Sequence, residues 1–82
     1  MSIKEEIRAF VINEVLRGED PSQFDDGMDL IESGILDSLA MMQLVTFLEG
    51  KFAVKVETSD IVPENFGSVE ALTAYVEAAL GS

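Results

Sequence analysis

Hydrophobic residues recur at helical spacing along the first part of the chain. Ser2 and Glu5 stand at the spacing of a capping box, in which each side chain accepts a hydrogen bond from the other residue's backbone N–H. Arg17 suits the last turn of a helix, and Gly18 suits the position just after it. We predict a first helix over about residues 3–17, with core-facing positions at Ile3, Ile7, Phe10, Val11 and Leu16.

The helical pattern returns between Asp37 and Phe52. One arc of this helix is strongly apolar and is expected to face the core: Met41, Leu44, Val45, Leu48 and Phe52. The opposite arc grades from apolar to weakly polar: Leu39, Ala40, Met42, Gln43, Thr46 and Phe47. A purely structural surface helix would carry charges on its outer arc, so this arc is a candidate docking surface. The alternative is that Met42 and Phe47 are covered by the neighbouring loop or by a short third helix.

Two further helices are predicted toward the C-terminus. Ser68 is placed to cap a last helix that ends before Gly81, with Tyr75 on its flank. A short helix is predicted around residues 59–65, with Pro63 in its first turn. The inward positions of the last helix are Val69, Leu72, Val76 and Leu80. The chain is therefore expected to be all-α, a small four-helix bundle of three main helices plus a short third helix.

A long connection, residues 18–37, separates the first two predicted helices. Pro21 and Gly27 break any helical period, and Gly34 stands where a positive φ would redirect the chain before the next helix. The connection is still rich in apolar residues, which we expect to attach it to the core: Phe24, Met28, Leu30, Ile31, Ile35 and Leu36. Long connections in small domains are usually functional or mobile.

Composition narrows the range of functions. The 82 residues, 48% of them hydrophobic, suit one small domain spanning residues 1–82. The chain has no Cys, His or Trp. It therefore lacks the commonest general base, the commonest metal ligand and a thiol nucleophile, so we expect neither an enzyme nor a metal site. No apolar run is long enough to span a bilayer and no secretory signal is visible, so we expect a cytoplasmic location.

The strong negative charge restricts the partners. Sixteen Asp and Glu against five Lys and Arg give a formal net charge of −11. Such a surface repels nucleic acids and anionic membranes, and it favours basic protein surfaces. Two interpretations remain open: the charge serves docking, or it only keeps a small monomeric protein in solution.

The junction at Asp37-Ser38 is the strongest candidate for chemistry. Asp37 is the natural N-cap of the second main helix, and Ser38 would project its hydroxyl from the first turn. The unpaired N–H groups and the helix dipole there favour an attached phosphate. When the dipeptide is taken alone, an ordinary helix cap is the preferred interpretation.

The wider motif Gly34-Ile35-Leu36-Asp37-Ser38-Leu39, about midway along an acidic helical chain, resembles the acyl carrier protein family. The resemblance extends over nearly the whole chain and implies the four-helix fold of that family. It implies that Ser38 carries covalent 4′-phosphopantetheine derived from coenzyme A, with Asp37 and Leu39 as the adjoining recognition residues. The implied function is a free-standing carrier that holds an acyl or aminoacyl group as a thioester and presents it to partner enzymes.

The resemblance also implies the partners: a phosphopantetheinyl transferase, an acyl- or aminoacyl-adenylating ligase, and a downstream transferase or synthase. Carriers of fatty-acid synthesis typically have an acidic second helix, whereas the acids here gather in the preceding loop, at Asp25, Asp26, Asp29 and Glu32. We therefore favour an aminoacyl, peptidyl or secondary-metabolite carrier over a fatty-acid carrier. The docking surface is assigned to Leu39, Ala40, Met42, Gln43 and Thr46.

Two alternatives belong to other classes. An unmodified acidic helical adaptor or inhibitor would fit the net charge, but it gives no reason for the motif around Ser38. A calcium loop around Gly27 would need acidic residues at its first and third positions and Glu at its twelfth. Those positions hold Ser22, Phe24 and Ser33, so the pattern fails.

Overall fold

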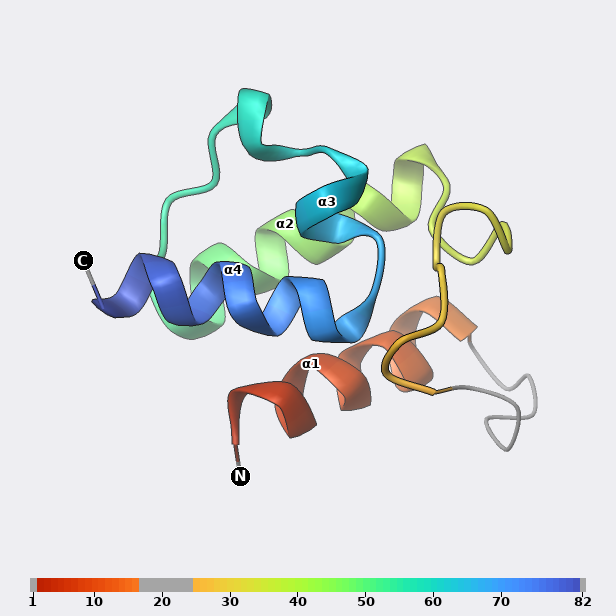
Figure 1. Ribbon diagram of the computed structural model, residues 1–82, viewed down its shortest axis with the longest axis horizontal. Helices are drawn as coiled ribbons and strands as arrows, with labels where there is room; N and C mark the ends of the chain where they lie inside the picture. Colours follow the sequence, from red (N-terminus) through yellow and green to blue (C-terminus); the bar gives the residue numbers. More distant parts are fainter. Residues whose placement is uncertain (1, 17–24, 82) are drawn as a thin grey trace.

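The computed structural model describes residues 2–16 and 25–81, which form helices and contain no β-strand. The order of elements is α1 (Ile3–Phe10), the π-helix η1 (Val11–Leu16), α2 (Ser38–Phe52), the 3₁₀-helix η3 (Thr58–Asp60), α3 (Pro63–Phe66) and α4 (Val69–Gly81). Figure 1 shows α1, α2 and α4 as the long helices of the bundle, with the short α3 preceding α4. The predicted all-α fold, with three main helices and a short third one, is confirmed.

The first helix begins as predicted but changes its winding. The Ser2 hydroxyl accepts the Glu5 N–H at 3.1 Å, and the Glu5 carboxylate accepts the Ser2 N–H at 3.1 Å, so the capping box is present. The hydrogen bond from the Ser2 backbone N–H to the carboxylate, together with the nearby Ser2 hydroxyl, lowers the pKa of Glu5. A continuous α-helix to residue 17 is wrong, because the segment from Val11 onward is a π-helix. Arg17 and Gly18 lie outside the described residues.

The spacing of buried residues gives a reason for the π-winding. Val11 and Leu16 are both buried, yet five residues are about 1.4 turns of an α-helix and would place them on different faces. A π-helix pairs residues five apart, so it returns Leu16 to the face that Val11 occupies. The five-residue spacing of Val11 and Leu16 is visible in the sequence, but a helical wheel drawn at a constant angle of about 100° per residue cannot predict a change to π-helix.

The core is formed by side chains from every helix longer than one turn and from the connection before α2. Leu44 and Leu48 of the predicted arc of α2 are fully buried, and Met41, Val45 and Phe52 pack partly buried against the cluster. The rest of the buried cluster comprises Ile7, Val11, Leu16, Leu30, Leu36, Ala40, Val54, Phe66, Val69, Leu72 and Val76. One inward prediction is wrong: Leu80 is 50% exposed, because it lies in the last turn of α4, beyond the part of the helix that the core covers.

The predicted helix at residues 59–65 is two shorter elements, η3 and α3. Pro63 occupies the first turn of α3, as predicted. Ser68 caps α4, since its hydroxyl accepts the Ala71 N–H at 3.1 Å, and α4 continues through Gly81 instead of ending before it. The Tyr75 hydroxyl donates to the Asp60 carboxylate at 2.9 Å. Burial, helped by this hydrogen bond, raises the pKa of Tyr75.

The connection before α2 is attached to the bundle through its backbone. The Leu30 N–H donates to the Gly67 carbonyl at 2.7 Å, and the Asp26 carbonyl accepts the Glu70 N–H at 2.9 Å. The expected apolar contacts are present: Leu30 and Leu36 are buried, and Met28, Ile31 and Ile35 pack against the cluster. Pro21 and Phe24 lie outside the described residues. The connection is thus held to the bundle at Asp26 and Leu30, before the stretch that leads to Ser38.

Candidate functional site

The turn before α2 is fixed by local hydrogen bonds. The Asp29 carboxylate accepts the N–H groups of Ile31 at 3.0 Å and Glu32 at 2.8 Å. Gly34 has a φ of +82°, as predicted, and the chain then returns so that the Leu36 N–H donates to the Leu30 carbonyl at 2.9 Å. A positive φ is favourable for Gly and strained for most other residues. This turn directs the chain into the start of α2.

Asp37 and Ser38 form the start of α2. Asp37 is the N-cap, and its carboxylate accepts the Ala40 N–H at 2.8 Å. Ser38 is the first helical residue, and its side chain is exposed. The Ser38 and Leu39 N–H groups have no intrahelical acceptor at this position, and the positive end of the helix dipole adds to their potential. A phosphate attached to the Ser38 hydroxyl would therefore be stabilised by the helix end.

The structure also has room beside Ser38. A cleft of about 370 Å³ is lined by Ser38 and Asp37 together with the apolar side chains of Ile31, Leu36 and Met41. An accessible hydroxyl, a helix N-terminus and an adjoining apolar cleft suit a long arm that is joined through a phosphodiester. These residues fit 4′-phosphopantetheine.

Two side chains on the outer arc of α2 are less exposed than the sequence pattern predicts. Leu39 is 66% exposed and Met42 is 70% exposed, and Gln43 and Thr46 are exposed as well. Ala40 is only 8% exposed, so its assignment to the docking surface is wrong. It lies at the edge of the arc, where the small side chain is covered by the core.

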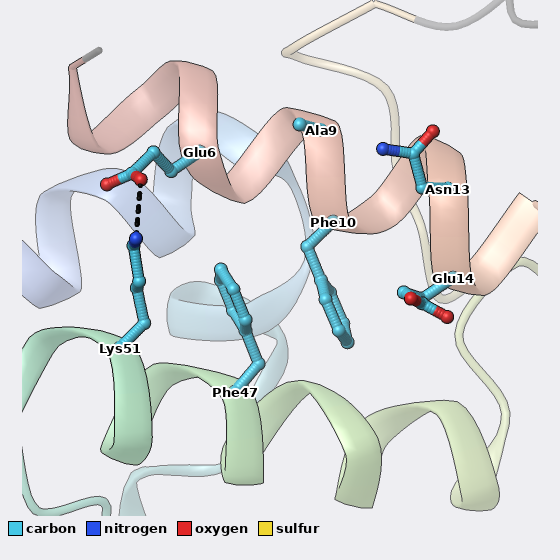
Figure 2. A pocket seen from close by; sticks show the side chains of 7 residues that line it. All are labelled: Glu6, Ala9, Phe10, Asn13, Glu14, Phe47 and Lys51. Atoms are coloured by element: carbon cyan, nitrogen blue, oxygen red, sulfur yellow. Dashed lines mark ion pairs between the residues drawn. The ribbon is translucent and has the colours of Figure 1, made fainter.

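Phe47 is the second correction on the outer arc. It is half-buried, and its ring stacks on Phe10 of α1, with the ring centroids 4.3 Å apart. The two rings lie in a hollow of about 260 Å³ between α1 and α2, whose far end is closed by an ion pair between Lys51 and Glu6 at 3.0 Å (Figure 2). The ring contacts of Phe47 are with Phe10 of α1 and with Phe52 of α2 itself.

Sequence reasoning missed one residue that positions the site. Asp26 was counted only as part of an acidic loop, but its carboxylate meets Arg8 at 3.0 Å and Lys4 at 3.8 Å. Lys4 and Arg8 are four residues apart on α1, which places them on one face and could have indicated a common acidic partner. The Asp26 carbonyl also accepts the Glu70 N–H, so Asp26 attaches the segment before α2 to both α1 and α4.

Acids of the loop that lie within residues 25–37 make local hydrogen bonds. Across residues 2–16 and 25–81 no group of three or more His, Cys, Asp or Glu side chains is placed to hold an ion. The Asp25 carboxylate accepts the Gly27 N–H at 2.9 Å, and that of Asp29 caps its own turn. In the same residues no helix combines the length and hydrophobicity needed to cross a bilayer.

Comparisons with known proteins agree with this site. A family model described as the phosphopantetheine attachment site matches residues 9–76. The D-alanyl carrier protein of Lactococcus lactis subsp. cremoris (strain MG1363) is 36% identical over 75 residues, which cover 92% of each chain. The D-alanyl carrier protein of Leuconostoc citreum (strain KM20) is 35% identical over 82 residues, 99% of this chain and 100% of the relative.

A structural comparison finds a similar fold in a solved chain. A chain in a solved structure described as the crystal structure of an FAD-dependent dehydrogenase has a TM-score of 0.79 and 34% identity, covering 85% of this chain and 97% of that chain. The family model spans most of the sequence, and the relatives match along nearly their whole length. The chain therefore belongs to the acyl carrier protein family and presents its cargo on covalently bound 4′-phosphopantetheine.

Proposed function

We propose that Ser38 is the attachment residue and that residues 1–82 act as a single carrier domain for an amino acid. The observation that carries the attachment site is the exposed Ser38 hydroxyl on the first turn of α2, beside the apolar cleft. Phosphopantetheine, when bound, supplies the thiol that holds the cargo as a thioester. The protein supplies attachment and addressing, and it performs no catalysis of its own.

Each residue of the site has a separate task in this proposal. The Ser38 Oγ attacks the pantetheine-bearing phosphorus of coenzyme A, the P–O bond of the pyrophosphate breaks, and adenosine 3′,5′-bisphosphate leaves, so that a phosphodiester joins Ser38 to the arm. The chain has no His, and the Asp37 carboxylate already accepts the Ala40 N–H, so the base that removes the Ser38 proton comes from the transferase. Asp37 fixes the start of α2, and Leu39 offers the transferase an apolar side chain next to the reacting hydroxyl.

Two observations support an amino acid as the cargo. Several relatives that match along most of their length are D-alanyl carrier proteins, alongside an acyl carrier protein, and this makes D-alanine the first candidate. No charged residue occurs on α2 from Ser38 through Leu48, which differs from the acidic second helix expected of a fatty-acid carrier. The partners we propose are a phosphopantetheinyl transferase, an adenylating ligase for the amino acid, and a downstream transferase or synthase in the same compartment, the cytoplasm.

Loading of the modified protein tests the cargo class. The phosphopantetheinylated protein would be incubated with ATP, D-alanine and a D-alanine-activating ligase, and separately with a fatty acid and a fatty-acyl ligase. We expect a mass gain of one alanyl group in the first reaction and little change in the second. The unmodified protein is the control and gains no mass in either. Exclusive fatty-acyl loading would contradict the amino-acid proposal and restore the fatty-acid carrier.

The proposed docking surface is Leu39, Met42, Gln43 and Thr46, without Ala40. Burying one Leu side chain contributes about 1.5–3 kcal/mol, so Leu39→Ser is expected to raise the KM of the transferase about tenfold or more. Leu80→Ser is the matched control. Leu80 is also an exposed Leu, but it lies in the last turn of α4 and not on α2. Steady-state kinetics would measure both variants. Equal KM values would remove Leu39 from the docking surface.

A further inference from the structure

Hollows lie near α2 between its start and the aromatic pair that joins α1 to α2. The cleft beside Ser38 shares Asp37 with a second hollow of about 170 Å³, which is lined by Val15, Leu39 and Gln43. That second hollow shares Glu14 with the hollow over Phe10 and Phe47. The two hollows that share Glu14 are called here the α1–α2 groove, which lies along α2 from Asp37 and Leu39, the neighbours of Ser38, toward Lys51.

Glu14 gives the α1–α2 groove its chemical character. Its side chain is exposed, it lines both hollows of the groove, and it has no ion-pair partner among the described residues. Figure 2 shows Glu14 and Phe10 directed toward α2 and Phe47 directed toward α1, while Asn13 points away. Lys51 is already paired with Glu6 at the far end. The groove therefore offers an apolar floor and a carboxylate that pairs with no cation of residues 2–16 and 25–81, which suits a small group with a positive charge.

The attached arm is long enough to bring such a group there. Side chains on a helix tilt toward its N-terminus, so Ser38 projects past the end of α2 and leaves the arm free to turn toward either side. Phe47 follows Ser38 by nine residues, about 14 Å along the helix. The backbone of phosphopantetheine has the length of about five extended residues, ~17 Å. The thiol end can therefore reach Glu14 and Phe47.

We propose that the α1–α2 groove receives the aminoacyl end of the loaded arm, with Glu14 accepting the free ammonium group and Phe10 and Phe47 forming the floor. The proposal rests on the proposed function, namely an amino acid carried on Ser38. It separates the aminoacyl cargo from a fatty-acyl cargo by chemistry, because only the aminoacyl group has an ammonium to pair with Glu14. Docking of the arm there would also reduce the exposure of the thioester to water.

Nuclear magnetic resonance of the loaded protein tests this. The isotopically labelled protein would be loaded from two coenzyme A analogues in which the terminal thiol is replaced by an amine, one bearing an alanyl amide and one bearing an acetyl amide. Intact mass would confirm complete loading with both. We expect the alanyl form to shift the backbone resonances of Phe10, Gln43 and Phe47 relative to the acetyl form. We expect Glu14→Gln to remove this difference, and Glu77→Gln, an exposed acid on α4, to leave it.

The possible failures are distinguishable. Complete loading with no shift difference at Phe10 and Phe47, or with differences confined to Ile31, Leu36 and Met41, would overturn the groove proposal and leave the attachment site standing. The same holds if the difference persists in Glu14→Gln. Absence of any mass gain on folded protein would overturn the proposed function, and this inference with it.

Discussion

Ser38→Ala is expected to abolish loading completely while leaving the fold unchanged. The phosphodiester requires a hydroxyl at this position, and Ala offers none. The structural cost is small, because the Ser38 side chain is exposed and the N-cap hydrogen bond comes from Asp37. Surface substitutions of this kind usually change stability by less than about 0.5 kcal/mol. Incubation with coenzyme A and a broad-specificity phosphopantetheinyl transferase, followed by intact mass, measures the effect.

Ser33→Ala is the matched control for this prediction. Ser33 is another exposed serine in the segment that leads to α2, and its hydroxyl donates to the Leu30 carbonyl at 3.3 Å. We expect this variant to accept one phosphopantetheinyl group like the wild type. Circular dichroism of both variants verifies that they are folded. Loading of the Ser38 variant at the wild-type level would show that the arm is attached elsewhere.

Gly67→Ala is expected to produce the largest loss of stability among simple substitutions in the connecting segments. A Cβ at Gly67 would lie 2.5 Å from the Pro63 carbonyl oxygen, which is a backbone atom and cannot move away as a flexible side chain can. The same residue donates its N–H to Pro63 and accepts the Leu30 N–H, so a shift there disturbs both α3 and the connection to α2. Overpacking of this kind costs about 1–3 kcal/mol. The Tm of thermal unfolding should fall by about 4–8 °C for each kcal/mol of stability lost.

Gly50→Ala should change stability in the opposite direction. Gly50 lies inside α2, and a Cβ there meets no atom within 4 Å. Replacing a helix-interior Gly by Ala typically stabilises by about 0.5–1 kcal/mol. Both variants replace Gly by Ala. Opposite signs of the two Tm shifts would therefore come from the different space around Gly67 and Gly50. A higher Tm for Gly67→Ala would contradict the packing described around α3.

Local signals in the sequence predicted the helix starts well. The capping residues Ser2, Asp37 and Ser68 all make the hydrogen bonds expected of them. Each of these bonds lies within three residues along the chain, so its geometry depends on little else. The turn at Gly34 and the exposed position of Ser38 could be predicted for the same reason.

The features that depend on neighbouring helices could not be predicted from the pattern. A helical wheel places Ala40 and Phe47 on the outer arc of α2, but it contains no information about α1, which covers Phe47 through its stacking on Phe10. The exposure of Leu80 depends on where the core ends relative to α4, and the ion pair between Arg8 and Asp26 joins residues distant in sequence. The groove that Glu14 lines arises from the same packing.

Peptide mapping of the loaded wild-type protein tests the central claim most directly. After incubation with coenzyme A and a phosphopantetheinyl transferase, intact mass gives the number of attached groups, and fragmentation of the proteolytic peptides locates them. The structure predicts one phosphopantetheinyl group, with every modified fragment containing Ser38. A group located on another residue, or no gain in mass on protein shown to be folded, would contradict the assignment of this chain as a carrier loaded at Ser38.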